Sequence, residues 1–197
     1  MIRMRVLVFI LLITPIFFGC EGEYSPKPKA YVRLNLPEHS YIVPDSTWSC
    51  PYIFEASRYS FLTVDKRHHK ENCWYNIYYP KLKATIHLTY SELDNNLSRQ
   101  IEENHKLAMK HVGKATAINE SLIENKEAQV YGLIYEFKGE TASDMQFFAT
   151  DSLNHFLRGS LYFNLKPNKD SLGPAIDYVK NDVRHFIQSL RWTQRAD

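Results

Sequence analysis

A short apolar segment at the N-terminus, closed by a cysteine, constrains the rest of this chain more than any other feature. Basic residues precede an unbroken apolar run over residues 6–13, and a glycine precedes Cys20. The segment is shorter than the about 20 residues of a membrane-spanning helix, and Pro15 interrupts it. A basic start, a short apolar stretch and a small residue before the cut are typical of an export signal. Residues 1–19 are therefore predicted to be a signal peptide, so that the remainder folds outside the cytoplasm.

The cysteine itself indicates a lipoprotein signal, in which cleavage occurs before a cysteine that carries a diacylglyceryl group. The preferred signal has Leu three residues earlier, where this chain has Phe17, so an ordinary secreted protein or an uncleaved anchor stays as an alternative. Acyl chains such as palmitate on Cys20 would hold the protein in a membrane, since each buried methylene contributes roughly 0.8 kcal/mol. Residues 20–30 contain two prolines and are expected to form an extended tether. Residues 31–197 then remain for a single globular domain.

The charge balance of the part after the signal excludes one class of partner. Without Arg3 and Arg5, the chain has 22 Lys and Arg against 22 Asp and Glu, a net charge of zero. Nucleic-acid binding requires a cluster of unopposed basic residues, so we expect no nucleic-acid partner. Aromatic residues make up 14% of the chain, which favours sheet because flat rings pack well on a pleated surface.

Two further cysteines, Cys50 and Cys73, would lie in an oxidising compartment, where disulfides persist. Each opens an aromatic run, and if these runs pair as neighbouring strands, a bridge would close a loop of about 24 residues and add roughly 3 kcal/mol. Two buried thiols are the alternative. A metal site with His68 and His69 is not expected, because no ligand pair has the spacing of a zinc site.

Two segments have the apolar spacing of amphipathic helices. The first is predicted to begin at Ser91 and to end near Gly113, and the second to begin around Pro174. The expected apolar stripes are Leu93, Leu97, Ile101, Ala108 and Val112 in the first, and Ile176, Val179, Val183, Phe186, Ile187 and Leu190 in the second.

The other periodic segments are predicted to be strands. Residues 83–90 alternate apolar and polar side chains, and aromatic and β-branched runs occupy residues 127–138, 145–150 and 155–165. Turns are expected at residues 139–140 and 151–154, and the order of elements indicates an α+β fold, an antiparallel sheet layered with amphipathic helices. The final helix running into Trp192 resembles the end of PsbP-like domains, an analogy of fold alone.

A search for catalytic motifs finds no phosphate loop, no zinc-protease helix and no nucleophile elbow. Asp151, Ser152 and His155 stand close together, but no orienting group or oxyanion hole accompanies them, so turn chemistry is the expected role. Arg158 lies within a predicted strand, either as a structural ion-pair partner or as a contact for a partner or ligand. His87 is expected on the polar face of its strand. No cofactor and no metal is predicted.

Long blocks of the sequence resemble the gliding-motility lipoprotein GldD family of Bacteroidetes, over about residues 20–192. The blocks are Cys20 with Tyr24-Ser-Pro-Lys-Pro-Lys, Leu34-Asn-Leu-Pro37, Cys50-Pro-Tyr-Ile-Phe-Glu, Cys73-Trp-Tyr-Asn-Ile-Tyr-Tyr-Pro80, Lys83-Ala-Thr-Ile-His-Leu-Thr-Tyr90, Asn95-Asn-Leu97, Lys110-His111, Val130-Tyr-Gly132, Thr150-Asp-Ser-Leu-Asn-His-Phe-Leu-Arg-Gly159 and Leu161-Tyr-Phe163.

The resemblance implies a non-enzymatic, membrane-anchored component needed for gliding, in cells whose motility apparatus is tied to type IX secretion. The leading hypothesis is a scaffold or assembly lipoprotein that docks other envelope proteins, on the periplasmic side of the outer membrane in preference to the inner membrane. The alternative is a ligand-binding lipoprotein that takes a lipid, a glycan or a peptidoglycan fragment near His87 and Arg158. An envelope hydrolase built on Asp151, Ser152 and His155 is the third hypothesis.

Three short motifs resemble the acceptor sequence for O-glycosylation of exported Bacteroidetes proteins. In each, Asp precedes a hydroxyl residue and an apolar or Thr residue, which makes Ser46, Ser152 and Ser171 the candidate acceptors. Asp-Ser pairs are also favoured in turns and at helix starts, so the motifs have a structural explanation as well.

Overall fold

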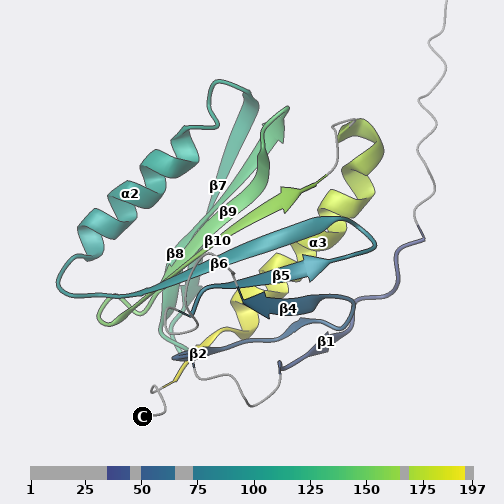
Figure 1. Cartoon of the computed structure of the whole chain (residues 1–197). Helices are drawn as coiled ribbons and strands as arrows, with labels where there is room; N and C mark the ends of the chain where they lie inside the picture. Colours follow the sequence, from purple (N-terminus) through teal and green to yellow (C-terminus); the bar gives the residue numbers. More distant parts are fainter. Residues whose placement is uncertain (1–34, 45–49, 65–72, 165–168, 194–197) are drawn as a thin grey trace, which may run out of the picture. The chain divides into compact units, whose positions relative to one another are not determined.

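The computed structural model describes residues 35–44, 50–64, 73–164 and 169–193, and for residues 169–171 it describes the backbone alone. The chain divides into residues 1–30 and a second unit, residues 31–197, which contains every described residue. This second unit is an antiparallel sheet with two helices (Figure 1). The α+β fold expected from the sequence is confirmed.

Seven strands make the main sheet, in the order β4-β5-β6-β10-β9-β8-β7, and every neighbouring pair is antiparallel. Strands β7 to β10 follow one another along the chain, and the pairing of β6 with β10 joins them to the earlier strands. The strands are β4 Phe61–Val64, β5 Tyr75–Tyr79, β6 Ala84–Glu92, β7 Ala115–Asn125, β8 Val130–Gly139, β9 Ser143–Thr150 and β10 His155–Phe163.

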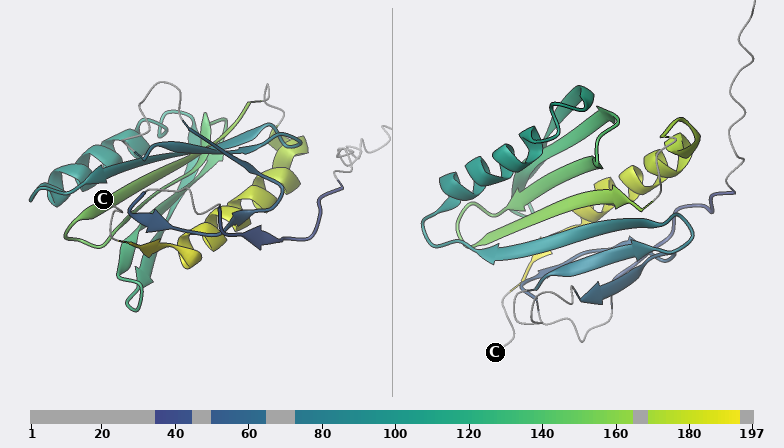
Figure 2. Two further views of the ribbon diagram at one scale, coloured as in Figure 1. Left: turned by 60° about the horizontal axis from the view of Figure 1, so that its bottom comes forward. Right: turned by 45° about the horizontal axis from the view of Figure 1, so that its top comes forward.

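Helices α2 (Leu97–Met109) and α3 (Lys169–Ser189) pack on opposite faces of this sheet, as the two views of Figure 2 show. Successive side chains of a strand point to opposite faces. Phe147 accordingly lies in the large core with α3, whereas Phe148 packs in the smaller cluster with α2. All six residues of the stripe predicted for α3 are buried.

Close packing on the α3 side requires a glycine in the middle of β10. Gly159 lies directly opposite Phe147 on β9, and the Phe147 ring occupies the space where a Cβ on residue 159 would stand. The aromatic ring therefore covers the strand backbone, and no larger residue fits there without a shift of the ring.

Two short ribbons complete the fold. Strand β1 (Tyr41–Ile42) pairs with β3 (Ala56–Ser57), and β2 (Tyr52–Ile53) pairs with β11 (Arg191–Trp192). The aromatic runs after the two cysteines therefore do not pair with each other, contrary to the arrangement considered from the sequence, because the C-terminal strand β11 takes the place beside β2.

A disulfide nevertheless joins Cys50 to Cys73, whose Cα atoms are 5.6 Å apart. Both residues are buried, and the hydroxyl of fully buried Tyr52 donates a hydrogen bond of 3.0 Å to the carbonyl oxygen of Cys73. The bridge links the β2–β11 ribbon to the start of β5 in the main sheet.

Both helix starts differ from the sequence prediction. Ser91 pairs with Phe156 as part of β6, and α2 begins only at Leu97, because pairing with β10 continues to the end of the strand. At its other end, Val112 is 53% exposed and lies beyond the helix. Helix α3 begins at Lys169 rather than around Pro174. The proline lies inside the helix, where its missing N–H group removes one backbone hydrogen bond.

Strands β1, β3, β4, β7 and β11 were not predicted, and one strand begins later than expected. Strand β7 has only Ile123 buried among its eleven residues, so its sequence has no apolar alternation to detect. Strand β8 begins at Val130 instead of residue 127, because the hairpin turn from β7 extends to Gln129, which has a positive φ of 52°. The strand at residues 83–90 and both predicted turns are confirmed.

Candidate functional site

The face of the sheet that carries α2 is only partly covered. The cluster beneath α2 consists of Ala108, Tyr135, Phe137, Phe148 and Phe156, with partly buried neighbours from α2 and from β7 and β8. Among the described residues, none from β4, β5 or β6 joins it. Figure 1 shows α2 beside the β7 end of the sheet, while β4 lies at the other end.

We call the uncovered part the open face. The strand register places ten side chains on it: Phe61, Thr63, Asn76, Tyr78, Thr85, His87, Thr89, Arg158, Ser160 and Tyr162. All of them except Ser160 are partly or fully exposed, and Phe61 is 62% exposed. The open face therefore combines aromatic rings with polar groups and one cation.

Arg158 is the cation of the open face and lies on β10, next to the edge of the α2 cluster. Its Nη2 lies 3.5 Å from Gln146 Oε1, a long contact, and its buried Nε has no hydrogen-bond partner. No carboxylate of the described residues lies within ion-pair distance of it. Burial lowers the pKa of Arg158, although an arginine keeps its charge in proteins. The structural ion pair considered from the sequence does not form with any described residue.

His87 lies on the same face, on the neighbouring strand β6. It stands opposite Ser160, while Thr89 stands opposite Arg158, so the two candidate contact residues are close neighbours. The His87 Nδ1 is 2.6 Å from Asn76 Oδ1, and its ring meets Tyr162 edge to face at 5.5 Å. The sequence prediction that His87 lies on the polar face is confirmed.

Polar side chains that the sequence did not single out continue this site toward α2. Gln146, 1% exposed, donates from its amide nitrogen to His111 Nε2 over 2.9 Å. Asn104, 2% exposed, sits among the apolar residues of α2, and neither of its amide atoms has a hydrogen-bond partner. A buried polar group without a protein partner costs free energy unless water or a bound molecule supplies the hydrogen bonds.

The predicted turn at residues 151–154 is held by the side chain of Asp151. Its Oδ1 accepts the backbone N–H groups of Leu153, Asn154 and His155 at 2.8–3.0 Å. Burial raises the pKa of Asp151, but these three donors outweigh it and leave the pKa below its ordinary value. Ser152 takes a positive φ of 72° at the exposed tip.

The side chain of His155 makes its contacts outside this turn. Its Nδ1 lies 2.8 Å from the hydroxyl of Tyr90, its ring stacks on Trp192 at 5.1 Å, and burial lowers its pKa. The imidazole of His155 thus hydrogen-bonds to Tyr90 and not to the side chain of Asp151 or Ser152, and the turn accounts for the latter two.

A second polar cluster, which no local pattern indicates, ties the N-terminal described segment to α3. Buried Asp182 accepts hydrogen bonds of 3.0 Å from the hydroxyls of Tyr41 and Tyr79, and its Oδ1 lies 2.6 Å from His39 Nδ1. Burial, together with the Asp182 charge, raises the pKa of both tyrosines. The Tyr41 ring also stacks on His185 at 3.5 Å. We call the contacts of Asp182 with His39, Tyr41 and Tyr79 the Asp182 clasp, because they hold the N-terminal described segment against α3.

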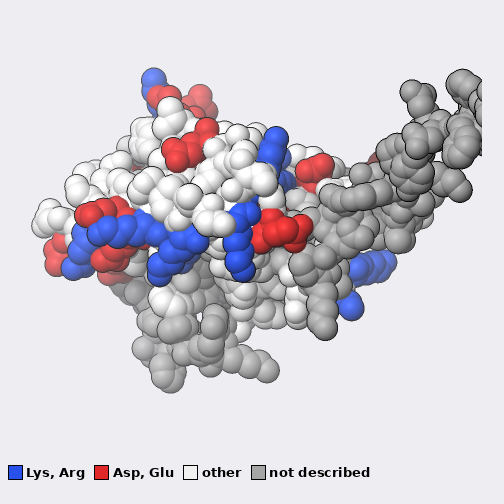
Figure 3. Space-filling view, turned by 90° about the horizontal axis from the view of Figure 1, so that it is seen from above, with Lys and Arg blue, Asp and Glu red and all other residues white. Residues whose placement is uncertain are grey.

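The charged side chains of the described residues are distributed without a patch of one sign on the face seen in Figure 3. On the face seen in Figure 3, basic and acidic side chains are intermixed, most densely on the side of α2. Pairs such as Glu102 with Lys106 and Arg99 with Glu103 follow the helix at a spacing of four residues. Such surface pairs contribute little to stability and form no patch of one sign.

Several predicted sites lie outside the described residues. Cys20 and Ser46 belong to undescribed segments, and of Ser171 only the backbone is described. Within the described part of the chain, no group of His, Cys, Asp and Glu side chains is arranged to hold a metal ion.

These features define an α+β domain with one apolar sheet face beneath α3 and one partly open, polar face. A family model described as "Gliding motility lipoprotein GldD" matches residues 21–192. The chain therefore belongs to the gliding motility lipoprotein GldD family, and the resemblance noted in its sequence is confirmed. The family is named for a motility lipoprotein and not for an enzymatic activity.

Membership of the family links the chain to gliding motility and to attachment at the cell envelope. No curated protein and no solved structure gave a significant match, so the likeness to PsbP-like domains stays a prediction. None of the described helices is long and apolar enough to cross a membrane.

Proposed function

We propose that this chain is a non-enzymatic lipoprotein that acts as a scaffold or assembly component of the gliding and type IX secretion apparatus. It docks other envelope proteins on the open face. The observation that carries this proposal is the uncompensated charge of Arg158 on a sheet face that α2 leaves partly uncovered.

The unpaired charge of Arg158 costs the fold free energy. A half-buried guanidinium without a carboxylate has lost hydration and gained no ion pair, so an apolar residue would suit the fold at least as well. A carboxylate brought by a partner would supply the missing charge and a planar, two-pronged hydrogen bond. The exposed rings of Phe61 and Tyr78 on the same face provide the aromatic contact area that protein interfaces favour.

Anchoring at Cys20 is the second part of the proposal. A lipid on this residue and an extended tether over residues 20–30 would keep the domain near the membrane, on the periplasmic side of the outer membrane. Replacing Cys20 with Ser is expected to leave the precursor uncleaved and free of acyl label. Normal acyl labelling of the variant would contradict this assignment.

A ligand-binding lipoprotein remains the second candidate, and one observation favours it. Buried Asn104 has no hydrogen-bond partner at either amide atom, as Arg158 has none at Nε. A lipid, glycan or peptidoglycan fragment with a carboxylate and hydroxyls could satisfy such groups. A small ligand would be retained by the purified protein, whereas a docked protein would be seen as a larger assembly.

The test compares Arg158→Ala with Arg99→Ala, which changes an exposed arginine of α2 outside the open face. In native membranes resolved by gel under native conditions, the parent and the Arg99 variant should migrate in a larger assembly and support gliding. The Arg158 variant should be equally abundant, migrate alone and fail to support gliding. If the Arg158 variant is retained in the assembly and cells glide normally, the proposed docking role is wrong.

A further inference from the structure

Strand β7 forms one end of the main sheet, and over its eleven residues no described strand pairs with its outer edge. Strand β4, at the other end, has only four. Exposed sheet edges are commonly protected by short length, proline or lysine, because their free N–H and C=O groups can pair with another chain. Strand β7 contains no proline, lysine or arginine, and its one irregularity in pairing lies at its start, between Ala115 and Ala117.

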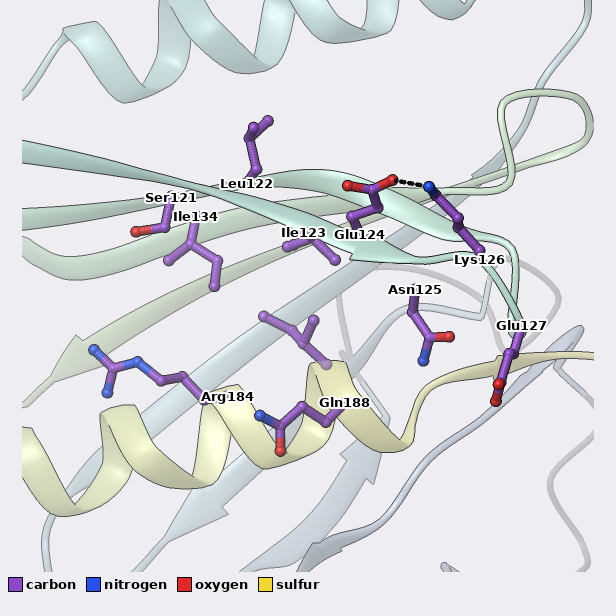
Figure 4. Close-up of a pocket in the computed structure, with 11 residues that line it drawn as sticks. Ser121, Leu122, Ile123, Glu124, Asn125, Lys126, Glu127, Ile134, Arg184 and Gln188 are labelled. Atoms are coloured by element: carbon purple, nitrogen blue, oxygen red, sulfur yellow. Dashed lines mark ion pairs between the residues drawn. The ribbon is translucent and has the colours of Figure 1, made fainter.

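Beneath this edge runs a groove of about 710 Å³ between β7 and the C-terminal half of α3. Figure 4 shows Ser121, Ile123 and Asn125 pointing from β7 toward α3, while Leu122 and Glu124 point to the opposite side. Arg184 and Gln188 form the α3 wall, and Arg184 is held by an ion pair with Glu136 of β8.

We propose that an extended segment of another envelope protein adds to the outer edge of β7 as an eighth strand, with alternate side chains entering this groove. In an antiparallel edge strand, about half of the residues direct both backbone groups outward, which gives such a segment a ladder of hydrogen bonds. The groove then accepts the side chains on the α3 side, and 82%-exposed Leu122 meets an apolar residue on the other side.

The charges of β7 indicate what kind of segment fits. Its two charged residues are both acidic, Glu120 and Glu124, and both are exposed. Glu124 is paired with Lys126 at 3.2 Å, whereas no described residue forms an ion pair with Glu120. An added strand therefore carries Lys or Arg opposite Glu120. A second copy of this chain fits poorly, because an antiparallel β7 pair centred on Leu122 would place Glu120 against Glu124.

The experiment uses the full chain in its own cells, with a photoreactive amino acid placed in turn at Glu120, Leu122 and Glu124. Leu153, 72% exposed on the turn between β9 and β10, is the control position. Crosslinked peptides are then sequenced. An added strand predicts that the three probes react with residues spaced about two apart along one segment of one protein, since the side-chain period of paired strands is two.

Three results would overturn the proposal: contacts scattered over several segments, a regular series within β7 of a second copy, or yields no higher than at Leu153. A charge variant sharpens the test. Glu120→Lys should reduce the crosslink yield from Leu122 about fivefold, whereas Glu103→Lys on α2 should leave it unchanged. Equal yields in the two variants would contradict the basic character assigned to the segment. Because Arg158 lies on the open face and not at this edge, failure here leaves the docking role of Arg158 unaffected.

Discussion

The two faces of the main sheet differ residue by residue along a single strand. On β6, Ala84, Ile86 and Leu88 are buried against the α3 core, while Thr85, His87 and Thr89 lie between them on the open face and are partly exposed. The same backbone thus supports an apolar layer on one side and a polar surface on the other. Folding free energy comes mainly from the first face, whereas the unpaired cation Arg158 belongs to the second.

The largest expected loss of unfolding free energy comes from removing a core side chain on the α3 side. Leu157→Ala should lower the free energy of unfolding by about 2–5 kcal/mol, since fully buried Leu157 leaves a cavity. Thr89→Ala, one strand away on the open face, should cost less than about 1 kcal/mol. Urea unfolding of the purified domain measures both. Similar costs for the two variants would show that the faces do not differ as described.

The second effect concerns the Cys50–Cys73 disulfide, which belongs to the core on the α3 side. Reducing it should lower the free energy of unfolding by roughly 3 kcal/mol, the usual value for a closed loop of this length. A Cys50→Ser, Cys73→Ser variant should unfold at the same urea concentration with and without reductant. Parent protein whose unfolding is insensitive to reductant would contradict a structural role for the bridge.

A smaller effect is expected at the turn of Asp151. Because the folded-state pKa of Asp151 is lowered, its carboxylate stabilises the fold above the pKa of the unfolded chain, about 4. That stabilisation is lost as the pH falls through the lower, folded-state pKa. Asp151→Ala should therefore cost about 1–2 kcal/mol at neutral pH, comparable to the loss of a helix N-cap, and progressively less below about pH 4.

Asp177→Ala on the exposed side of α3 serves as the control for this measurement. Its unfolding free energy should follow the parent protein at every pH. A difference between Asp151→Ala and the parent that persists unchanged at pH 2 would show that the charge of Asp151 is not what stabilises the turn.

Local patterns in the sequence predicted the elements whose residues interact with near neighbours. The alternation of residues 83–90 indicated β6, the stripe from Ile176 to Leu190 indicated α3, and the polar run at residues 151–154 indicated a turn. Strand β7 escaped prediction because an edge strand exposed on both sides has no periodic apolar signal. The start of α2 was misplaced because pairing with β10 overrides the capping signal at Ser91.

The candidate site was only partly accessible from sequence. His87 and Arg158 could be assigned to strand faces by counting, since the side-chain period is two. The Gln146 and His111 contacts could not be found, because nothing in a single sequence records which residues 35 positions apart meet. The Asp182 clasp joins residues 143 and 103 positions apart and follows only from the folded structure.

The central claim is that Arg158 is retained for binding and not for folding, and one variant tests it most directly. Arg158→Met keeps much of the side-chain volume and removes the unpaired charge. Its free energy of unfolding should equal that of the parent or exceed it by about 1 kcal/mol, because replacing a buried charge by a packed apolar group is often neutral or stabilising. Cells that carry it should nevertheless fail to glide. A variant destabilised by more than about 2 kcal/mol, in cells that still glide, would contradict the account.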